Sequence, residues 1–436
     1  MTPSPPPAST TPAPSRGVRP FAPVFISYRT SDGSDLAAAL AWALRATGVP
    51  VWHDVTDLPP GDTERRLQEA LTSGLSGAVL LVTADIQHSR VIREIEVPGL
   101  LALEPDPAFT FAIGSAIPRH LPAGSTAAAS LDHAAPDLLL AQPTGTLQRF
   151  KQYPVVDEAG IAVLAREIAA QRMAAVHTLG SSDLLLDIQT RLDPRGTPPE
   201  VPLAVRTRPP APGQRLPDPA IWPPFAAFLT DLPRLLSIAR AQRLHVRGGA
   251  HLTVAFALGA AVPTTSTWAV TVEDQAGNTW GEPSSQEHSR RRTTLREESQ
   301  TGEPSTAAAA PVAVYVDLVP SLPPGDAFAE HIAGHPGRYA RTIRLRLARR
   351  EPILPEAAST LVADLSDKIR ASAGLASTHR VHLFLRTPFP IAVLLGRTLN
   401  TLEVTLHEWD DTGTIPRYVE TATTASGRGG GPIVLR

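Results

Sequence analysis

Five polar or aromatic side chains of the kinds that bind small molecules lie at the ends of two short apolar runs. The runs at residues 24–28 and 50–53 are typical of buried parallel strands. An open parallel sheet binds its ligands at the carboxyl ends of its strands, and the side chains there are Ser27, Tyr28, Arg29, Trp52 and Asp54. Arg29 could hold a phosphate group through paired, charge-assisted hydrogen bonds, or it could be a surface arginine in a loop. Trp52 is more typical of a core residue than of a platform for ring stacking.

Two carboxylates follow further along the same part of the chain. Residues 88–96 read His-Ser-Arg-Val-Ile-Arg-Glu-Ile-Glu and begin a predicted helix, with Glu94 and Glu96 two positions apart. A helical glutamate followed by a second one is, taken alone, usually a solvated surface charge.

The five side chains at the strand ends and the two glutamates are separated in the sequence, and a fold of alternating strands and helices would bring them together. The sequence predicts such a fold. Apolar runs of strand length alternate with segments that carry leucines at helical spacing. This alternation predicts an α/β fold with a parallel sheet. The predicted strands cover residues 24–28, 50–53, 78–82 and 109–113, and the predicted helices cover residues 31–48, 63–73, 89–95 and 161–179.

The C-terminal part of the chain contains an internal duplication. Residues 243–259 align without gaps with residues 380–396, so that His245 falls on His382 and Gly259 falls on Gly396. Each copy reads as a strand, a tight loop and an apolar helix, and the two histidines are expected to serve packing. Two related α/β halves can enclose a cleft about a pseudo-twofold axis. The polar residues 281–310 between the copies are expected to be a flexible insertion.

Composition excludes several classes of protein. A chain of 436 residues suits two or three domains, and the absence of cysteine excludes disulfides, thiolate metal sites and a cysteine nucleophile. A formal net charge of −2 argues against a DNA-binding protein. Because no run of eighteen apolar residues exists and residues 1–20 resemble a disordered tail rather than a secretory signal, we expect a cytoplasmic protein without a membrane segment. No metal-ligand cluster or cofactor motif is recognisable.

The strings around the first two predicted strands resemble the TIR domain family. Phe25-Ile26-Ser27-Tyr28-Arg29 is similar to the family's first strand, and residues 51–62 are similar to its second strand and the loop that follows. The resemblance covers most of residues 21–104 and implies a flavodoxin-like domain over residues 21–178. TIR domains are either signalling scaffolds or enzymes that cleave NAD, and in an enzyme the five side chains at the strand ends would contact NAD.

The NAD-cleaving members carry a glutamate on their third helix, and Glu94 matches it best because Ile95 supplies the apolar residue that follows. Arg90 stands where the family often has an aromatic ring. Breaking the bond between nicotinamide and ribose gives an oxocarbenium-like transition state that a carboxylate can stabilise. The resemblance therefore implies Glu94 as the catalytic residue, with Glu96 as the alternative.

The duplicated part resembles the SAVED domain family, which consists of two fused CARF-like halves that recognise cyclic oligonucleotides. The resemblance lies in residues 382–400, residues 404–411 and Tyr418, and it implies a sensor domain over residues 179–436. Such a ligand needs arginines and backbone N–H groups for its phosphates and planar faces for its bases. Because the loops after the two equivalent strands should meet near the pseudo-twofold axis, they supply most of the candidates. These are Arg247, Gly248, Gly249, Arg386, Thr387 and Pro388, with Ser321 after a neighbouring strand.

Together the resemblances imply a TIR–SAVED fusion that is an NAD+ glycohydrolase activated by a cyclic oligonucleotide, with cyclic triadenylate as the expected activator. NAD+ is then a substrate, no cofactor is needed, and the products are nicotinamide and ADP-ribose. Such fusions resemble effectors of bacterial anti-phage (CBASS) signalling. The loop at residues 54–63 commonly packs against a neighbouring TIR domain, so Asp57 and Leu58 are expected to support ligand-dependent oligomers or filaments. The alternative is a non-enzymatic TIR module that recruits partners on ligand binding.

Overall fold

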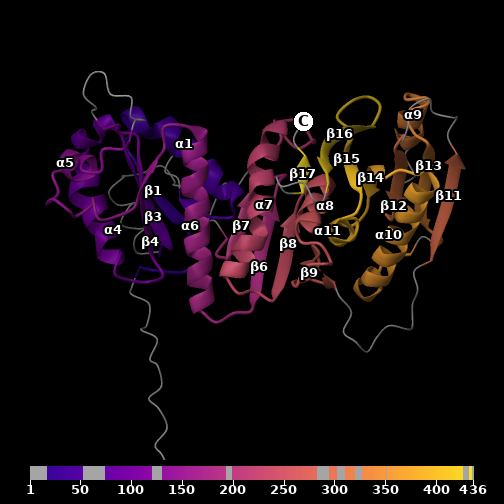
Figure 1. Ribbon diagram of the computed structural model, residues 1–436, viewed down its shortest axis with the longest axis horizontal. Helices are drawn as coiled ribbons and strands as arrows, with labels where there is room; N and C mark the ends of the chain where they lie inside the picture. Colours follow the sequence, from indigo (N-terminus) through magenta and orange to yellow (C-terminus); the bar gives the residue numbers. More distant parts are fainter. Residues whose placement is uncertain are drawn as a thin grey trace, which may run out of the picture. The chain divides into compact units, whose positions relative to one another are not determined.

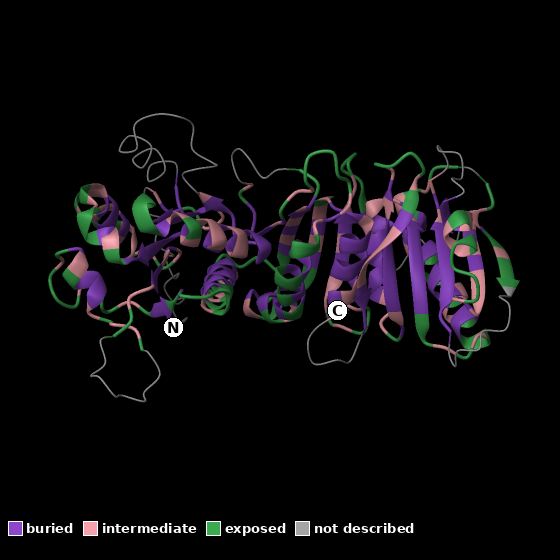
Figure 2. Ribbon diagram, turned by 90° about the horizontal axis from the view of Figure 1, so that it is seen from above, coloured by how far each residue is buried: buried purple, intermediate pink, exposed green. Residues whose placement is uncertain are grey.

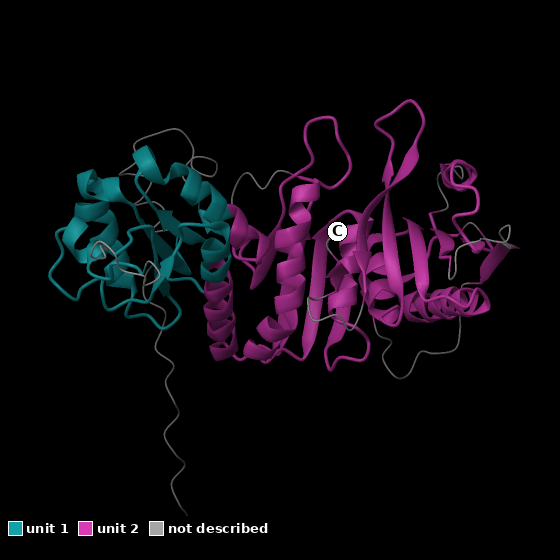
Figure 3. Cartoon of the chain, turned by 45° about the horizontal axis from the view of Figure 1, so that its top comes forward, with its two compact units in different colours: residues 1–41, 51–164 teal, residues 42–50, 165–436 magenta. Residues whose placement is uncertain are grey.

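The computed structural model describes residues 17–52, 74–119, 130–192, 199–281, 294–301, 310–319, 327–349, 351–425 and 432–434. The chain divides into two compact units, which Figure 3 colours separately: residues 1–41 with 51–164, and residues 42–50 with 165–436. The division falls inside helix α6 (Glu158–Thr178), whereas the sequence placed the domain boundary just after this helix. Among the described residues, no helix has the length and apolar character needed to cross a membrane.

The first unit contains a parallel sheet of five strands in the order β2-β1-β3-β4-β5. This is the flavodoxin-like order: β2 is added on one side of β1, and β3, β4 and β5 on the other, so the strand order reverses between β1 and β3. The predicted strands are confirmed as β1 (Val24–Ser27), β2 (Val51–Trp52), β3 (Gly77–Val82) and β4 (Thr110–Ser115). Strand β3 is buried along its whole length, as expected of a strand covered on both faces.

Helices follow the strands of the first unit and supply the rest of its core (Figure 1). They are α1 (Thr30–Ala46), a short helix at Ala84–His88, a π-helical turn at Ile92–Glu96 that continues into α4 (Val97–Leu103), α5 (Ala135–Leu139) and α6. The helix predicted at residues 63–73 lies outside the described residues.

Three segments of the first unit were not anticipated. Strand β5 (Gln152–Pro154) and helix α5 lie between residues 113 and 161, where the sequence predicted no strand or helix. Val18, which fell within the expected tail, is buried and bridges to Leu75. Each is short and acquires its structure from the neighbours on which it packs, so local periodicity did not reveal it.

The second unit holds two sheets with the same strand order, which confirms the duplication. The first sheet runs β10-β9-β8-β6-β7, and the second runs β11-β13-β12-β14-β15-β16-β17, so that β13-β12-β14-β15-β16 repeats β7-β6-β8-β9-β10. In both sheets the last hairpin of the shared order, β9 with β10 and β15 with β16, is antiparallel. The central strands of the second sheet are buried over most of their length (Figure 2).

The strands of the first sheet are β6 (Asp183–Gln189), β7 (Leu203–Arg206), β8 (Arg243–Gly249), β9 (Ala269–Glu273) and β10 (Thr279–Gly281). Those of the second are β11 (Leu295–Thr301), β12 (Val312–Asp317), β13 (Arg341–Leu347), β14 (Arg380–Arg386), β15 (Glu403–Asp410), β16 (Arg417–Thr424) and β17 (Ile433–Val434). The helices are α7 (Trp222–Ile238), α8 (Leu252–Ala261), α9 (Ala327–Ala333), α10 (Ala358–Leu375) and α11 (Phe389–Thr398), with single turns at Pro219–Ile221 and Pro355–Ala357.

The expected insertion at residues 281–310 is partly ordered. Within it, β11 pairs antiparallel with β13 and extends the second sheet. The sequence Leu-Arg-Glu-Glu-Ser-Gln-Thr is almost wholly polar because β11 is an edge strand, and a polar edge discourages further strand pairing. The expectation of a flexible insertion was therefore wrong for residues 295–301.

The two halves meet through helices α8 and α11, which cross at equivalent glycines. A Cβ atom on Gly259 would overlap the carbonyl oxygen of Val393, and one on Gly396 would overlap the carbonyl oxygen of Phe256. The aligned residues of the duplication thus contact each other reciprocally, as in a twofold interface. Glycine is required here because only a residue without a side chain lets the two helix backbones approach this closely.

This crossing makes a prediction about stability. Gly259→Ala or Gly396→Ala should destabilise the second unit by about 1–3 kcal/mol, the usual cost of overpacking a filled interface. Gly374→Ala in α10 is the matched control, because a Cβ there meets open space and alanine favours a helix. Chemical unfolding monitored by tryptophan fluorescence would measure the difference. Equal stability in all three variants would show that the helices do not need the close approach.

Candidate functional site

The carboxyl ends of β1 and β3 form the first candidate site, because the order of the strands reverses between them and open parallel sheets bind ligands at such a point. Asp32, in the first turn of α1, accepts hydrogen bonds from the Thr83 hydroxyl and the Asp85 backbone N–H, both at 2.8 Å. The Ser31 hydroxyl donates to Asp85 at 2.9 Å, and Arg29 Nε donates to the Ser31 Oγ at 2.9 Å. The loops after the two strands are thereby held together.

A buried hydrogen bond connects the end of β1 to the helical segment after β3. The Ser27 hydroxyl donates to Glu96 Oε2 at 2.5 Å, and the two residues are 1% and 7% exposed. Ile92, Ile95 and Glu96 share the inward face of the segment, as positions three and four apart do on a helix. The π-helical turn at Ile92–Glu96 is a local feature that is frequent near functional sites.

Glu94 lies on the opposite face of this segment. Its side chain is 46% exposed, and its carboxylate accepts a hydrogen bond from Arg90 Nε at 2.7 Å and contacts Arg93 at 3.4 Å. The hydrogen bond from Arg90 is the largest cause that holds the pKa of Glu94 below its usual value. Glu94 therefore carries an ionised carboxylate open to solvent, whereas that of Glu96 is enclosed.

The other residues singled out in the first unit have different surroundings. Tyr28 is buried, and Trp52 packs against the core cluster that contains Phe25 and Leu100, in agreement with a core role. Asp54, Asp57 and Leu58 lie outside the described residues. The sequence did not single out Asp32, Thr83 and Asp85, although all three stand just after predicted strands.

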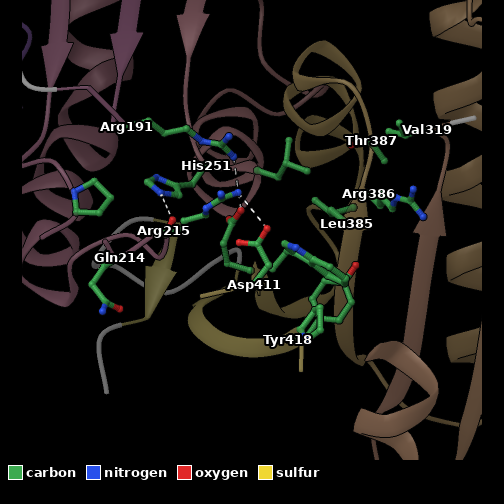
Figure 4. Close-up of a pocket in the computed structure, with 15 residues that line it drawn as sticks. Arg191, Gln214, Arg215, His251, Val319, Leu385, Arg386, Thr387, Asp411 and Tyr418 are labelled. Atoms are coloured by element: carbon green, nitrogen blue, oxygen red, sulfur yellow. Dashed lines mark hydrogen bonds and ion pairs between the residues drawn. The ribbon is translucent and has the colours of Figure 1, made fainter. Parts of the chain in front are cut away.

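The second candidate site is a cavity of about 750 Å³ in the second unit. Its walls come from both halves of the duplication (Figure 4). The first half supplies Arg191, Pro210, Gln214, Arg215, His251 and Leu252. The second half supplies Val319, Leu385, Arg386, Thr387, Glu408, Trp409, Asp411, Pro416 and Tyr418. The volume is within the range typical of small-molecule sites, about 300–1,000 Å³.

Each of the three arginines at this cavity lies near a carboxylate. Arg215 donates a hydrogen bond to Asp411 at 3.0 Å, and Arg191 lies 3.9 Å from Glu408. Arg386 lies 3.6 Å from Asp317, at the end of the neighbouring strand β12. The hydrogen bond of Arg215 leaves its remaining N–H groups able to donate to a phosphate.

Glu408 joins the two halves at the start of α8, next to His251, which is hydrogen-bonded within the first half. The Glu408 carboxylate accepts hydrogen bonds from the Thr253 backbone N–H at 3.0 Å and from the Thr253 hydroxyl at 2.7 Å. His251 is hydrogen-bonded to the Thr190 hydroxyl and to the Arg215 carbonyl, each at 2.8 Å. Burial lowers the pKa of His251, so its ring is neutral near neutral pH.

Aromatic rings form one wall of the cavity. Trp409 and Tyr418 meet edge to face with their centroids 5.3 Å apart, and Tyr418 also packs against Phe384 and Tyr315. These contacts hold Trp409 and Tyr418 in place at the cavity. Planar groups held in this manner can stack on the bases of a nucleotide.

The predicted ligand-binding residues divide between the cavity and its surroundings. Arg386 and Thr387 line the cavity, and Pro388 stands next to them as the residue that precedes α11. Ser321 lies outside the described residues. Arg247, Gly248 and Gly249 are not among the residues that line it.

The expected equivalence of Arg247 and Arg386 was wrong. Arg386 is the last residue of β14, and the last residue of β8 is Gly249, so Arg247 corresponds to Phe384. Arg247 lies within the sheet, where its Nε donates to Asp187 at 2.9 Å. The sequence missed Arg191, Arg215 and His251, because their position at the cavity depends on how the two halves meet.

Comparisons with known proteins agree with this division of the chain. Residues 24–103 match the family model of the TIR domain. Residues 229–423 match the family model described as the SMODS-associated and fused to various effectors sensor domain, or SAVED.

One curated relative is the NAD(+) hydrolase PdTIR of Paracoccus denitrificans (strain Pd 1222). It is 39% identical over 82 residues, which are 19% of this chain and 27% of that protein, so the chain spans about a quarter of the length of this relative.

Solved structures also match, among them two receptors. The Acinetobacter baumannii Cap4 SAVED/CARF-domain containing receptor with the cyclic trinucleotide 3'3'3'-cAAA has a TM-score of 0.43 and 12% identity, over 91% of this chain and 99% of that chain. The Moraxella osloensis Cap4 SAVED/CARF-domain containing receptor has a TM-score of 0.39 and 11% identity, over 89% of this chain and 97% of that chain. On the two family matches, the chain combines an N-terminal TIR domain with a C-terminal SAVED sensor domain.

Proposed function

We propose that this protein is an NAD+ glycohydrolase that a cyclic oligonucleotide activates, with nicotinamide and ADP-ribose as products. The observation that carries the proposal is the 39% identity of its TIR domain to an NAD(+) hydrolase, on a chain that also carries a SAVED sensor domain. An enzyme of this kind depletes the NAD of the cell that contains it. We therefore propose a role in anti-phage defence.

Glu94 is our candidate for the catalytic carboxylate. Departure of nicotinamide leaves positive charge on the ribose, and an ionised carboxylate beside that sugar stabilises the transition state. The Glu94 carboxylate meets this need, because it is exposed and its pKa is lowered. Glu96 already holds the Ser27 hydroxyl in a buried environment. We assign Glu96, together with Ser27, a positioning role, and we propose an NAD contact for Arg29 at the end of β1.

The cavity in the SAVED domain is our candidate for the activator site. A cyclic oligonucleotide presents several phosphates and bases in one compact ring, so its receptor needs cationic and planar groups around a single space. Arg191, Arg215 and Arg386 provide the cationic groups, and Trp409 and Tyr418 provide the planar groups. We propose a cyclic triadenylate as the activator.

The first test concerns catalysis by the full chain, incubated with NAD+ and a panel of cyclic oligonucleotides. Glu94→Gln should lower the rate of NAD+ cleavage by on the order of 10² to 10³, the usual effect of losing a principal electrostatic group. Binding of the activator should be unchanged. Glu104→Gln is the matched control, because Glu104 is also paired with an arginine, Arg149 at 2.9 Å, but follows α4 rather than a strand end.

Two results would contradict this proposal in different ways. Activity of Glu94→Gln within a few-fold of the parent would remove Glu94 from the catalytic role and make Glu96→Gln the next variant. A parent protein that binds a cyclic oligonucleotide without cleaving NAD+ would favour the non-enzymatic module that recruits partners.

The second test concerns the activator site. Arg386→Ala should weaken binding of the activator by about 1.5–3 kcal/mol, the range for hydrogen bonds to charged groups, which is roughly 10- to 150-fold in Kd. NAD+ cleavage should recover at higher activator concentration, because the catalytic domain is unaltered. Arg380→Ala is the matched control, since Arg380 begins the same strand and pairs with Glu403 at the opposite end from the cavity. Equal affinity in these two variants, measured by calorimetry, would reject the cavity.

The third test concerns assembly. We propose that the activator promotes ordered association of protomers, with the TIR loop that carries Asp57 and Leu58 as one contact surface. A contact between two different surfaces propagates as an open array unless the rotation closes it. Sedimentation with saturating activator should therefore show large particles, and Asp57→Arg should lower activity without a comparable loss of activator affinity. A fully active protein that sediments as a monomer would disprove this mechanism.

A further inference from the structure

Three neighbouring strands of the second sheet bring two histidines and a glutamate together. His382 on β14, His407 on β15 and Glu420 on β16 each offer one donor atom, and these atoms all lie within 4.8 Å of one another. His407 is directly opposite Glu420 in the antiparallel pairing of β15 with β16. From this arrangement we propose that His382, His407 and Glu420 bind a divalent transition-metal ion of the zinc class.

The two histidines are buried and already face each other. His382 and His407 are 4% and 2% exposed, and Nδ1 of His382 lies 2.9 Å from Nε2 of His407. One of these two nitrogens therefore carries the shared proton and the other accepts it. The remaining ring nitrogen of His407, Nδ1, is buried and has no hydrogen-bond partner among the described residues. A cation bound by both of these facing nitrogens takes the place of the shared proton, and the His407 ring then carries its proton on Nδ1.

The kind of donor determines the kind of metal. Two imidazole nitrogens with one carboxylate suit zinc and its neighbours in the first transition row. Calcium and magnesium prefer sets made only of oxygen atoms, so they fit poorly.

The residues around the three ligands would support such a site and limit its affinity. His331, in α9, stacks edge to face on the His407 ring with centroids 5.2 Å apart, and its Nε2 is 2.9 Å from the Tyr339 hydroxyl. The ring contact packs α9 against the His407 ring. Arg338 pairs with Glu420 at 3.1 Å, so a metal ion must share the carboxylate with a guanidinium or displace it. We therefore expect weaker binding than in a site with four dedicated ligands.

The duplication supplies a matched comparison inside the same chain. The positions equivalent to His382 and His407 in the first sheet are His245 and Glu273, whose side chains lie 3.3 Å apart. The residue opposite Glu273 on β10 is Thr279, where the second sheet has Glu420. The first sheet thus offers two donors at this place and the second offers three.

The experiment measures metal binding to the full chain without an affinity tag, after treatment with a chelator. Calorimetry with Zn²⁺ and elemental analysis should give one equivalent per chain. Co²⁺ should give the visible absorption of a low-coordinate site. His382→Asn and Glu420→Gln should each lower the affinity by about 100-fold or more, because loss even of a partner outside the ligand set costs about 10- to 100-fold. His245→Asn should bind as the parent does.

The Glu420→Gln variant keeps the test decisive if the histidine variant fails to fold, because Glu420 is only half-buried and glutamine has its size. Circular dichroism would establish that each variant is folded. A parent chain that binds no zinc would overturn the proposal. So would zinc binding of unchanged affinity in Glu420→Gln, or binding lost equally in His245→Asn.

Discussion

The close crossing of helices α8 and α11 is the constraint on which the SAVED unit depends. Each helix begins just after a central strand ends, so their separation fixes the distance between the ends of β8 and β14. Gly259 and Gly396 allow the backbones to touch, and almost every side chain of the two helices is buried. A helix that is apolar on all sides cannot turn away without exposing its surface to water. Two cavity residues are held in place by this packing: His251, which directly precedes α8, and Thr387, which stands two residues before α11.

In the TIR unit a single buried hydrogen bond has a comparable role. Ser27 ends β1 and donates to the enclosed carboxylate of Glu96, so the helical segment after β3 is fixed in rotation about its axis. A buried carboxylate is stable only when it is well paired. Glu94 lies two residues away in the same π-helical turn, on the opposite face, where its side chain is 46% exposed. The enclosed carboxylate thus keeps the second carboxylate exposed.

The charges around the cavity are nearly balanced, and this affects what it can bind well. Three arginines and two carboxylates line it, and the carboxylates Glu408 and Asp411 each lie beside one of the arginines. A phosphate must compete with these carboxylates, so phosphate charge alone contributes modestly to affinity. Contacts with bases, through Trp409 and Tyr418, then have to supply much of the binding energy and of the selectivity. This balance favours a ligand with both phosphates and bases over a simple anion.

The sequence by itself determined the elements of the fold and its division into a TIR part and a duplicated part. Alternating apolar runs predicted β1 to β4, and the aligned segments that end in Gly259 and Gly396 predicted two equivalent sheets. Both signals are local, since the period of apolar residues reflects which face each element buries. Arg386 and Thr387 were found in this way because they end a recognisable strand. The tertiary structure decided what local patterns cannot encode: that Arg247 pairs with Asp187 instead of lining the cavity, that Arg191, Arg215 and His251 do line it, and that Glu94 rather than Glu96 is exposed. His382, His407 and Glu420 are far apart in the sequence and form no recognisable ligand motif. Only the pairing of the three strands that carry them brings them together. Such placements arise from packing between segments distant in the chain, and no window of sequence contains both partners.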